Sequence, residues 1–327
     1  MFTLAHMSDL HIGPLPTPKR LELMNKRLFG YLNWHKSRKN MHHRPTLDRL
    51  KDDLGSANPN HVVITGDIVN IGMREEYLQA LAWLKQVGAS KDVSVIPGNH
   101  DVYVPLLKEP GIGRWNQFMT NDGEDEHIHS SSREGFPFVR RRDDVAIIGL
   151  SSAMPTMPLI AAGRLGVTQR QKLHDHLVAL GKEKLFRVIL IHHPPFSHAG
   201  NWFRGLRDAL KFQEIIASAG AELILHGHDH NHKIRSMQGP SGPIPVVGIP
   251  SASAISHPHK PLSRYNLYNI ERANTGWRCE MSGRGLRTNT SPIETLSQID
   301  LFDHVQKGHH LAPQQKSPDQ RDIATVD

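Results

Sequence analysis

The order of apolar and polar positions along the chain predicts short strands that alternate with amphipathic helices. Runs of apolar and β-branched residues with the length of buried strands cover residues 2–7, 61–65, 93–96, 145–150, 186–191, 223–225, 245–249, 265–270 and 277–281. Apolar residues recur at helical spacing over residues 74–87, 169–180 and 209–219, and in a helix that begins near Thr46. We expect Thr46, Thr168 and Asp208 to cap three of these helices, because their side chains can accept hydrogen bonds from free backbone N–H groups.

This arrangement favours an α/β fold. Early strands that alternate with helices are typical of a largely parallel sheet, whereas the last three strands follow one another across Gly-Pro turns, which favours antiparallel pairing. The length of 327 residues fits one large domain, which we assign to residues 1–303, with a basic and aromatic insert at 19–45. Apolar periodicity ends at residues 304–327, so a disordered tail is predicted there.

Composition narrows the class of protein. With 38% apolar and 22% charged residues, the chain has the composition of an ordinary globular domain. Its single cysteine, Cys279, excludes both an internal disulfide framework and a cysteine-rich zinc finger. The sequence has neither an apolar run of about 20 residues nor a signal peptide at its start, so a cytoplasmic enzyme is expected.

The net charge of +7 is concentrated in one segment. Residues 19–44 hold eight basic residues and one acidic residue, Glu22, and so account for the whole net charge. A basic segment with Tyr31 and Trp34 suits an anionic membrane surface at the inner face of the membrane, or a lipid-bearing substrate. A helix packed on the domain with a solvated basic side explains it equally well. Because the rest of the chain is neutral, nucleic acid is not an expected partner.

Polar side chains that can bind metal follow five of the predicted strands. They are Asp9 and His11, then Asp67, Asn99, His192, and finally His228 and His230. Ligands of open α/β sheets bind outside the carboxyl ends of the strands, so these residues are expected to meet at one edge. Such a donor set without cysteine suits Mn²⁺, Fe²⁺ or Zn²⁺. Seven ligands are enough for two divalent ions that share a carboxylate.

These motifs resemble a known family. Asp-x-His, Gly-Asp, Gly-Asn-His-Asp, His and Gly-His-x-His, in this order over residues 1–270, resemble the signature of the calcineurin-like metallophosphoesterases. The resemblance implies a four-layer α/β/β/α sandwich with a dinuclear centre between its sheets. It also implies that Asp9, His11 and His230 hold the first metal, that Asn99, His192 and His228 hold the second, and that Asp67 bridges them.

The same resemblance implies a phosphoric ester hydrolase in which a metal-bridging hydroxide attacks phosphorus. His100 matches the histidine beside the leaving group, where a protonated imidazole can donate to the departing oxygen. We expect Asp101 to orient His100 by a hydrogen bond. His193, which follows a ligand, is interpreted as structural.

Substrate choice is less constrained. In the loop after His192, Trp202 and Phe203 could wall a base or acyl chain, and Arg204 or Arg207 could contact phosphate. Packed aromatic residues next to a helix cap are the alternative.

The layout is similar to that of bacterial cyclic-nucleotide and glycerophosphodiester phosphodiesterases, which favours a small phosphodiester. The alternative is a pyrophosphate hydrolase of a lipid-linked nucleotide such as UDP-diacylglucosamine. A nuclease and a non-catalytic scaffold rank below both.

Overall fold

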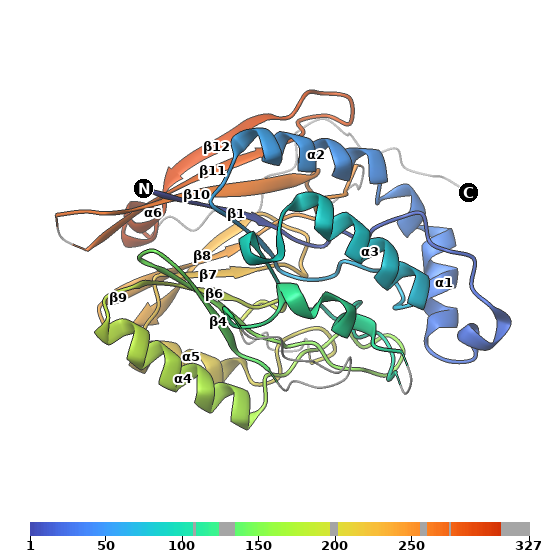
Figure 1. The fold of residues 1–327 in the computed structure, drawn as a ribbon, viewed down its shortest axis with the longest axis horizontal. Helices are drawn as coiled ribbons and strands as arrows, with labels where there is room; N and C mark the ends of the chain where they lie inside the picture. The colour runs from blue at the N-terminus through green and yellow to red at the C-terminus, as the bar shows by residue number, and fades with distance from the viewer. Residues whose placement is uncertain (107–108, 124–134, 197–201, 256–259, 275, 309–327) are drawn as a thin grey trace, which may run out of the picture.

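Two six-stranded sheets form the centre of the protein (Figure 1). The computed structural model describes residues 1–106, 109–123, 135–196, 202–255, 260–274 and 276–308. The first sheet has the order β12 (Glu294–Asp300), β11 (Trp277–Gly285), β10 (Arg264–Arg272), β1 (Phe2–Met7), β2 (His61–Ile64) and β3 (Val93–Val95). The second has the order β4 (Phe138–Arg142), β5 (Val145–Gly149), β6 (Phe186–Leu190), β7 (Leu223–His226), β9 (Gly242–Gly248) and β8 (Lys233–Gly239).

Each sheet has a parallel part bordered by antiparallel strands. Strands β1, β2 and β3 are parallel, and so are β5, β6, β7 and β9. The strands β10, β11 and β12 add to β1 in antiparallel register, as do β4 to β5 and β8 to β9. The antiparallel pairing expected at the end of the chain is confirmed for β10 and β11. It is wrong for one of the two pairings of β9, because β9 is antiparallel to β8 but parallel to β7.

Helices cover the outer faces of both sheets, so the α/β/β/α sandwich is confirmed (Figure 1). Helices α2 (Arg44–Ala57) and α3 (Arg74–Val87) lie on the first sheet, and α4 (Val167–Lys182) and α5 (Ala209–Ala219) on the second. The alternation of side chains along a strand divides the apolar residues of β6 between two cores. Val188 and Leu190 join the core between the sheets, while Ile189 packs under α4 and α5.

The structure adds three strands that apolar patterning did not predict: β4, β8 and β12. All three lie at or beside a sheet edge, where strands carry polar residues, and β12 has no fully buried residue. Helix α2 begins at Arg44, two residues before Thr46, because Pro45 fits its first turn. Thr168 likewise lies inside α4, which follows Gly166. Asp208 precedes α5, but its carboxylate accepts hydrogen bonds from Leu165 and Gly166 at the start of α4.

The basic insert folds into three short helices, η1 (Arg20–Leu23), α1 (Arg27–Lys36) and η2 (Arg38–Asn40). Trp34 is buried, and Arg27 donates to the backbone carbonyls of Ile71 and Gly72. Gly30 permits the close approach of α1, because a Cβ there would lie 2.5 Å from Ile71 and 2.6 Å from the Tyr103 hydroxyl. One side of the insert is therefore packed on the domain.

The chain's last described helix, α6 (Leu301–Gln306), overlaps the tail predicted at residues 304–327. Asp300 caps this helix, and Val305 is buried, so that prediction was wrong for residues 304–306. Residues 309–327 lie outside the described part of the chain. Among the helices that the structure describes, none has the length and apolar character to cross a bilayer.

Candidate metal centre

The seven predicted ligand residues come together beyond the carboxyl ends of five strands. Asp9 and His11 follow β1, Asp67 follows β2, Asn99 follows β3, His192 follows β6, and His228 and His230 follow β7. Asp9, His11, Asp67, His228 and His230 all have positive φ, between 40° and 68°. Non-glycine residues adopt this conformation at an energetic cost that the surrounding fold must offset, and such strain is concentrated at functional sites. The backbone turns sharply after each strand and directs these side chains to one point.

One group of donor atoms is formed by Asp9, His11 and His230. Nε2 of His230 lies 3.1 Å from Oδ1 of Asp9 and 3.4 Å from Nε2 of His11. Nε2 of His11 lies 4.0 Å from Oδ2 of Asp67. Three imidazole or carboxylate donors at such spacing are suited to bind a divalent ion.

A second group is formed by Asn99, His192 and His228. Oδ1 of Asn99 lies 3.2 Å from Nε2 of His192 and 2.9 Å from Nδ1 of His228. Nε2 of His192 also lies 3.4 Å from Oδ2 of Asp67. The carboxylate of Asp67 therefore lies within reach of both groups, in the position that a shared ligand needs.

Backbone carbonyls fix the orientation of two of the histidines. Nδ1 of His192 donates to the carbonyl of Thr65 at 2.7 Å, and Nδ1 of His11 donates to the carbonyl of Val69 at 3.2 Å. Because Nδ1 of each ring donates to a carbonyl, Nε2 faces the cluster and is the nitrogen through which the ring can bind a metal ion.

The electrostatics of the cluster favour metal ligands. Burial alone would raise the pKa of Asp67, but the nearby His192 and His100 outweigh it and hold the pKa well below its usual range. Burial opposes charge on His192, yet Asp67 raises its pKa to about 9. Burial and then the Arg38 charge hold the pKa of His11 well below its usual range. The ionised Asp67 and the neutral His11 are in the donor state that a divalent ion requires, whereas His192 must release a proton when an ion binds to it.

His100 and Asp101 are not hydrogen-bonded to one another, so that expectation was wrong. Nδ1 of His100 donates instead to the carbonyl of Asn70. The carboxylate of Asp101 accepts from the backbone N–H groups of Ile68 and Val69 at 2.8 and 3.0 Å and of Gly98 at 2.8 Å. Asp101 thus joins the loop that carries Asp67 to the loop that carries Asn99. Burial and the Asp67 charge raise its pKa to about 7.

The structure brings two further residues to the cluster, Arg38 and His42, both from the basic insert. Arg38 lies 2.9 Å from Nε2 of His11 and 3.0 Å from Nε2 of His100. Burial and then this positive charge lower the pKa of His100 to about 3. The ring of His42 lies 4.4 Å from that of His11, measured between centroids. No strand-end pattern marks these residues; the charge of the insert and its place after Asp9 and His11 were the available signals.

The predicted substrate residues lie in a loop whose first part, residues 197–201, is outside the described residues. Trp202 and Phe203 are exposed, and the Arg207 guanidinium stacks on the Trp202 ring at 4.1 Å. Arg204 lies near enough for its charge to lower the pKa of His228, after burial and the His192 charge. Arg204 therefore lies near the cluster, whereas the Arg207 guanidinium stacks on Trp202.

His193 has a structural environment, as interpreted from the sequence. Its Nδ1 lies 2.7 Å from the Ser152 hydroxyl, and its Nε2 donates to the carbonyl of Ala161 at 3.1 Å. Both ring nitrogens of His193 therefore have hydrogen-bond partners, and neither partner is a candidate metal ligand.

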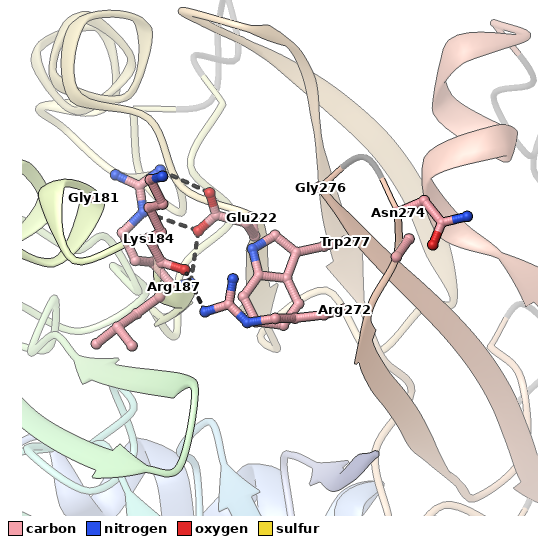
Figure 2. Close-up of a pocket in the computed structure, with 10 residues that line it drawn as sticks. Gly181, Lys184, Arg187, Glu222, Arg272, Asn274, Gly276 and Trp277 are labelled. Carbon is pink, nitrogen blue, oxygen red and sulfur yellow. Dashed lines mark hydrogen bonds and ion pairs between the residues drawn. The ribbon is translucent and has the colours of Figure 1, made fainter.

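A surface pocket lies at the other end of the strands (Figure 2). It is lined by residues such as Arg187 and Glu222, near the amino ends of β6 and β7, and by Arg272 and Trp277 of the β10–β11 hairpin. Two of its charged residues, Arg187 and Glu222, form an ion pair at 2.8 Å. None of the residues that line it belongs to the metal cluster.

Comparisons with known proteins agree with this site. The sequence model of the calcineurin-like phosphoesterases matches residues 2–232. A dimetal phosphatase from Danio rerio is 15% identical, aligns over 90% of this chain and 98% of its own, and has a TM-score of 0.58. Purple acid phosphatase PPD1 from yellow lupin (Lupinus luteus) seeds is 13% identical, aligns over 91% of this chain and 53% of its own, and has a TM-score of 0.58. At these identities the likeness shows a shared fold.

Among curated protein sequences, none matches the chain significantly. The family match nevertheless spans more than half of the chain and includes every predicted ligand position from Asp9 to His230. The chain belongs to the calcineurin-like phosphoesterases, a family of metal-dependent hydrolases.

Proposed function

We propose that the protein is a dinuclear metal-dependent phosphohydrolase that cleaves a small phosphodiester, with a cyclic nucleotide as one form of that substrate. The observation that carries the proposal is the place of Asp67, whose carboxylate lies within reach of two separate groups of nitrogen and oxygen donors. One ion would be held by Asp9, His11 and His230, the other by Asn99, His192 and His228, with Asp67 shared. The donor set fits Mn²⁺, Fe²⁺ or Zn²⁺.

Two such ions, when bound, supply Lewis acidity toward phosphoryl oxygens and lower the pKa of water. The protein's own part is to position the donors before the ions bind. The carbonyls of Thr65 and Val69 fix the rings of His192 and His11, and Asp101 holds the loops of Asp67 and Asn99 together. Asp101 is thus a positioning residue in this proposal.

His100 and Arg38 are placed to act on the substrate. Nε2 of His100 faces the cluster because its Nδ1 donates to Asn70. The Arg38 guanidinium, with several N–H donors, suits a phosphoryl oxygen that would draw it away from His100. Withdrawal of Arg38 removes a positive charge from beside His100, so that the imidazole gains a proton more readily and can donate it to a departing oxygen.

Positive side chains surround the cluster. Arg38 and Arg204 lower the pKa of nearby histidines, after burial in each case, and Lys26 adds to the same effect on His100. Trp202, two residues before Arg204, is 59% exposed although the Arg207 guanidinium stacks on its ring. This setting supports an anionic substrate with an aromatic or apolar group next to its phosphate.

A lipid-linked nucleotide pyrophosphate such as UDP-diacylglucosamine is the second candidate substrate. The observation in its favour is the apolar side of the insert, where Leu21 is 79% exposed, Met24 79% and Phe29 54%. Leu28 and Leu32 are exposed on the same insert, whose Arg38 reaches the cluster. Apolar side chains amid basic ones suit an anionic membrane surface or acyl chains.

A substrate panel tests both candidates. The metal-reconstituted protein is assayed with 3′,5′-cyclic AMP, bis(p-nitrophenyl) phosphate, p-nitrophenyl phosphate and UDP-diacylglucosamine in anionic vesicles. We expect hydrolysis of the diesters to exceed that of the monoester. Hydrolysis of none of the four by protein that holds metal would contradict the proposed function.

The insert separates the two candidates. A variant with Leu21, Met24 and Phe29 changed to Ser is compared with Leu210→Ser, an exposed leucine on α5. If the triple variant loses activity on the vesicle substrate alone, the substrate class is the lipid-linked pyrophosphate. If all three proteins cleave cyclic AMP equally and none cleaves the lipid, the substrate class is the small phosphodiester.

A further inference from the structure

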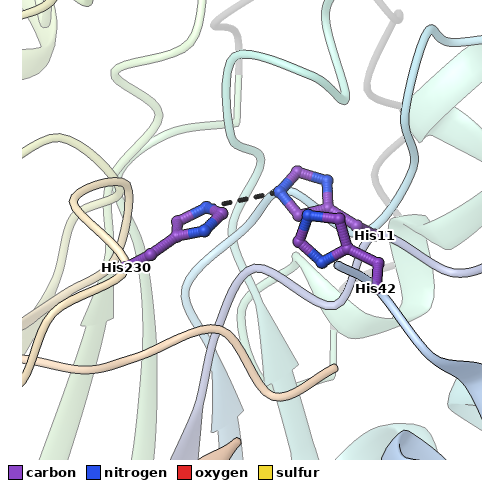
Figure 3. A group of neighbouring side chains, drawn as sticks. All are labelled: His11, His42 and His230. Atoms are coloured by element: carbon purple, nitrogen blue, oxygen red, sulfur yellow. Dashed lines mark hydrogen bonds between the residues drawn. The ribbon is translucent and has the colours of Figure 1, made fainter. Parts of the chain in front are cut away.

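A histidine outside the predicted ligand set faces the first group of donor atoms. His42 lies beside His11 and His230 (Figure 3), with its ring 4.4 Å and 5.8 Å from theirs. One ring nitrogen from each of the three lies within 4.8 Å of the others. Nε2 of His42 is buried and has no hydrogen-bond partner among the described residues. Buried polar atoms in folded proteins nearly always have a partner, so this nitrogen requires an explanation.

A chain of hydroxyl groups fixes which nitrogen of His42 carries the proton. Ser251 donates to the carbonyl of Asp9 at 2.6 Å, so at its 3.3 Å contact with Ser253 the Ser251 oxygen accepts. Ser253 then donates to Ser251, and its own oxygen, 2.8 Å from Nδ1 of His42, accepts the proton of that nitrogen. Nε2 of His42 is left with a free lone pair, in a ring that lies beside His11 and His230.

The backbone around His42 is held against the domain. His42 forms an isolated antiparallel bridge with Ala254, His43 donates to the carbonyl of Ser253 at 2.9 Å, and Ile255 donates to that of Met41 at 3.0 Å. Held on both sides, the imidazole keeps its orientation without a ligand. A fixed ring orientation and a fixed tautomer are the features by which neighbouring groups preorganise a histidine to bind a metal ion.

We propose that His42 is a further ligand of the first metal ion, together with Asp9, His11 and His230. This inference rests on the dinuclear centre of the proposed function. As a consequence, the basic insert supplies a ligand to the metal ion, in addition to its contacts with the domain through residues such as Arg27. The insert then carries its exposed apolar residues at a set distance from the first ion.

Metal binding to the full-length chain tests the proposal. Metal-free protein is titrated with Co²⁺, and binding is followed by calorimetry and by the visible absorption of the bound ion. The variant His42→Asn keeps an N–H near Ser253 but removes Nε2. We expect its affinity at one of two sites to fall by roughly 100-fold, with a changed absorption spectrum of that site. Ser253→Ala, which loosens the ring and leaves the ligand in place, should cost about tenfold.

Two further variants keep the result interpretable. His35→Asn, on the same insert with its ring against Tyr31, should bind both ions as the unchanged protein does. His11→Asn should lose the first ion. If His11→Asn loses it while His42→Asn binds both ions with unchanged affinity and spectrum, His42 is structural and the inference fails although the dinuclear centre stands. If the unchanged protein binds no Co²⁺, the proposed function itself fails. Circular dichroism of each variant establishes that it is folded.

Discussion

The guanidinium of Arg38 joins His11 to His100, at 2.9 Å from Nε2 of the first and 3.0 Å from Nε2 of the second. A candidate metal ligand and the histidine expected beside the leaving group thus share one positive charge from the basic insert. The guanidinium lies where a cation bound to His11 would have to lie. Metal binding and the position of Arg38 are therefore coupled.

Replacement of Arg38 by Met should separate its two effects. Without the guanidinium, Nε2 of His11 is free, so affinity for the first metal ion should rise. Loss of charge-assisted hydrogen bonds to the substrate, each about 1.5–3 kcal/mol, should raise KM by roughly 10- to 100-fold. Steady-state kinetics and metal titration measure the two effects. Lys39→Met, an exposed cation of the same insert, should change neither. An unchanged KM in Arg38→Met would exclude a contact with substrate.

His100→Ala should reduce turnover and leave the metal in place. Nδ1 of His100 donates to the carbonyl of Asn70, and His100 belongs to none of the candidate groups of metal ligands. Loss of a general acid typically lowers the rate by about 10²- to 10⁴-fold. Metal analysis and kcat measured on the same sample test this expectation. A sample with depleted metal would instead identify His100 as a ligand.

Asp67→Asn should weaken binding of both ions, since its carboxylate lies within reach of both groups of donors. The amide that replaces it is a neutral and weaker ligand, so metal content should fall at both sites and activity with it. The matched control is Asp229→Asn, which lies between His228 and His230 but pairs with Lys233 at 3.0 Å. Metal content by mass spectrometry compares the two. Loss of one ion only would show that Asp67 is not shared.

The candidate ligand positions could be identified from the sequence because two local signals coincide there. Asp67 and His192 each come directly after an apolar strand, and the carboxyl ends of parallel strands meet at the same edge. The strain at positions such as Asp9 and His228 is a consequence of these turns and has no signal of its own in the sequence.

Arg38 and His42 could not be predicted, because their positions depend on how a long insert folds back. His42 is fixed by Ser253, 211 residues away along the chain, and Arg38 reaches His100 across 62 residues. Within the insert the structure exposes the apolar Leu28 and Leu32 and buries the charged Arg27, the reverse of what their polarity alone favours. Long-range contacts of this kind override local patterning.

His61, the buried first residue of β2, should make the protein sensitive to acid. Burial and then the nearby Arg142 lower its pKa to about 3 from the 6.5 of an exposed histidine. Between these values the unfolded chain binds a proton that the folded protein does not, so stability is lost as the pH falls from 6.5 toward 3, by up to roughly 1.4 kcal/mol per pH unit. His61→Gln keeps a donor near the Ser94 hydroxyl but has no group that titrates in this range. Its free energy of unfolding should therefore fall less steeply with decreasing pH than that of the unchanged protein, by up to roughly 1.4 kcal/mol per pH unit. Denaturant unfolding of metal-free protein at pH 7, 6 and 5 measures it, with His174→Gln on α4, a partly exposed histidine, as the control. Equal slopes for His61→Gln and the unchanged protein would mean that His61 is protonated in the folded state.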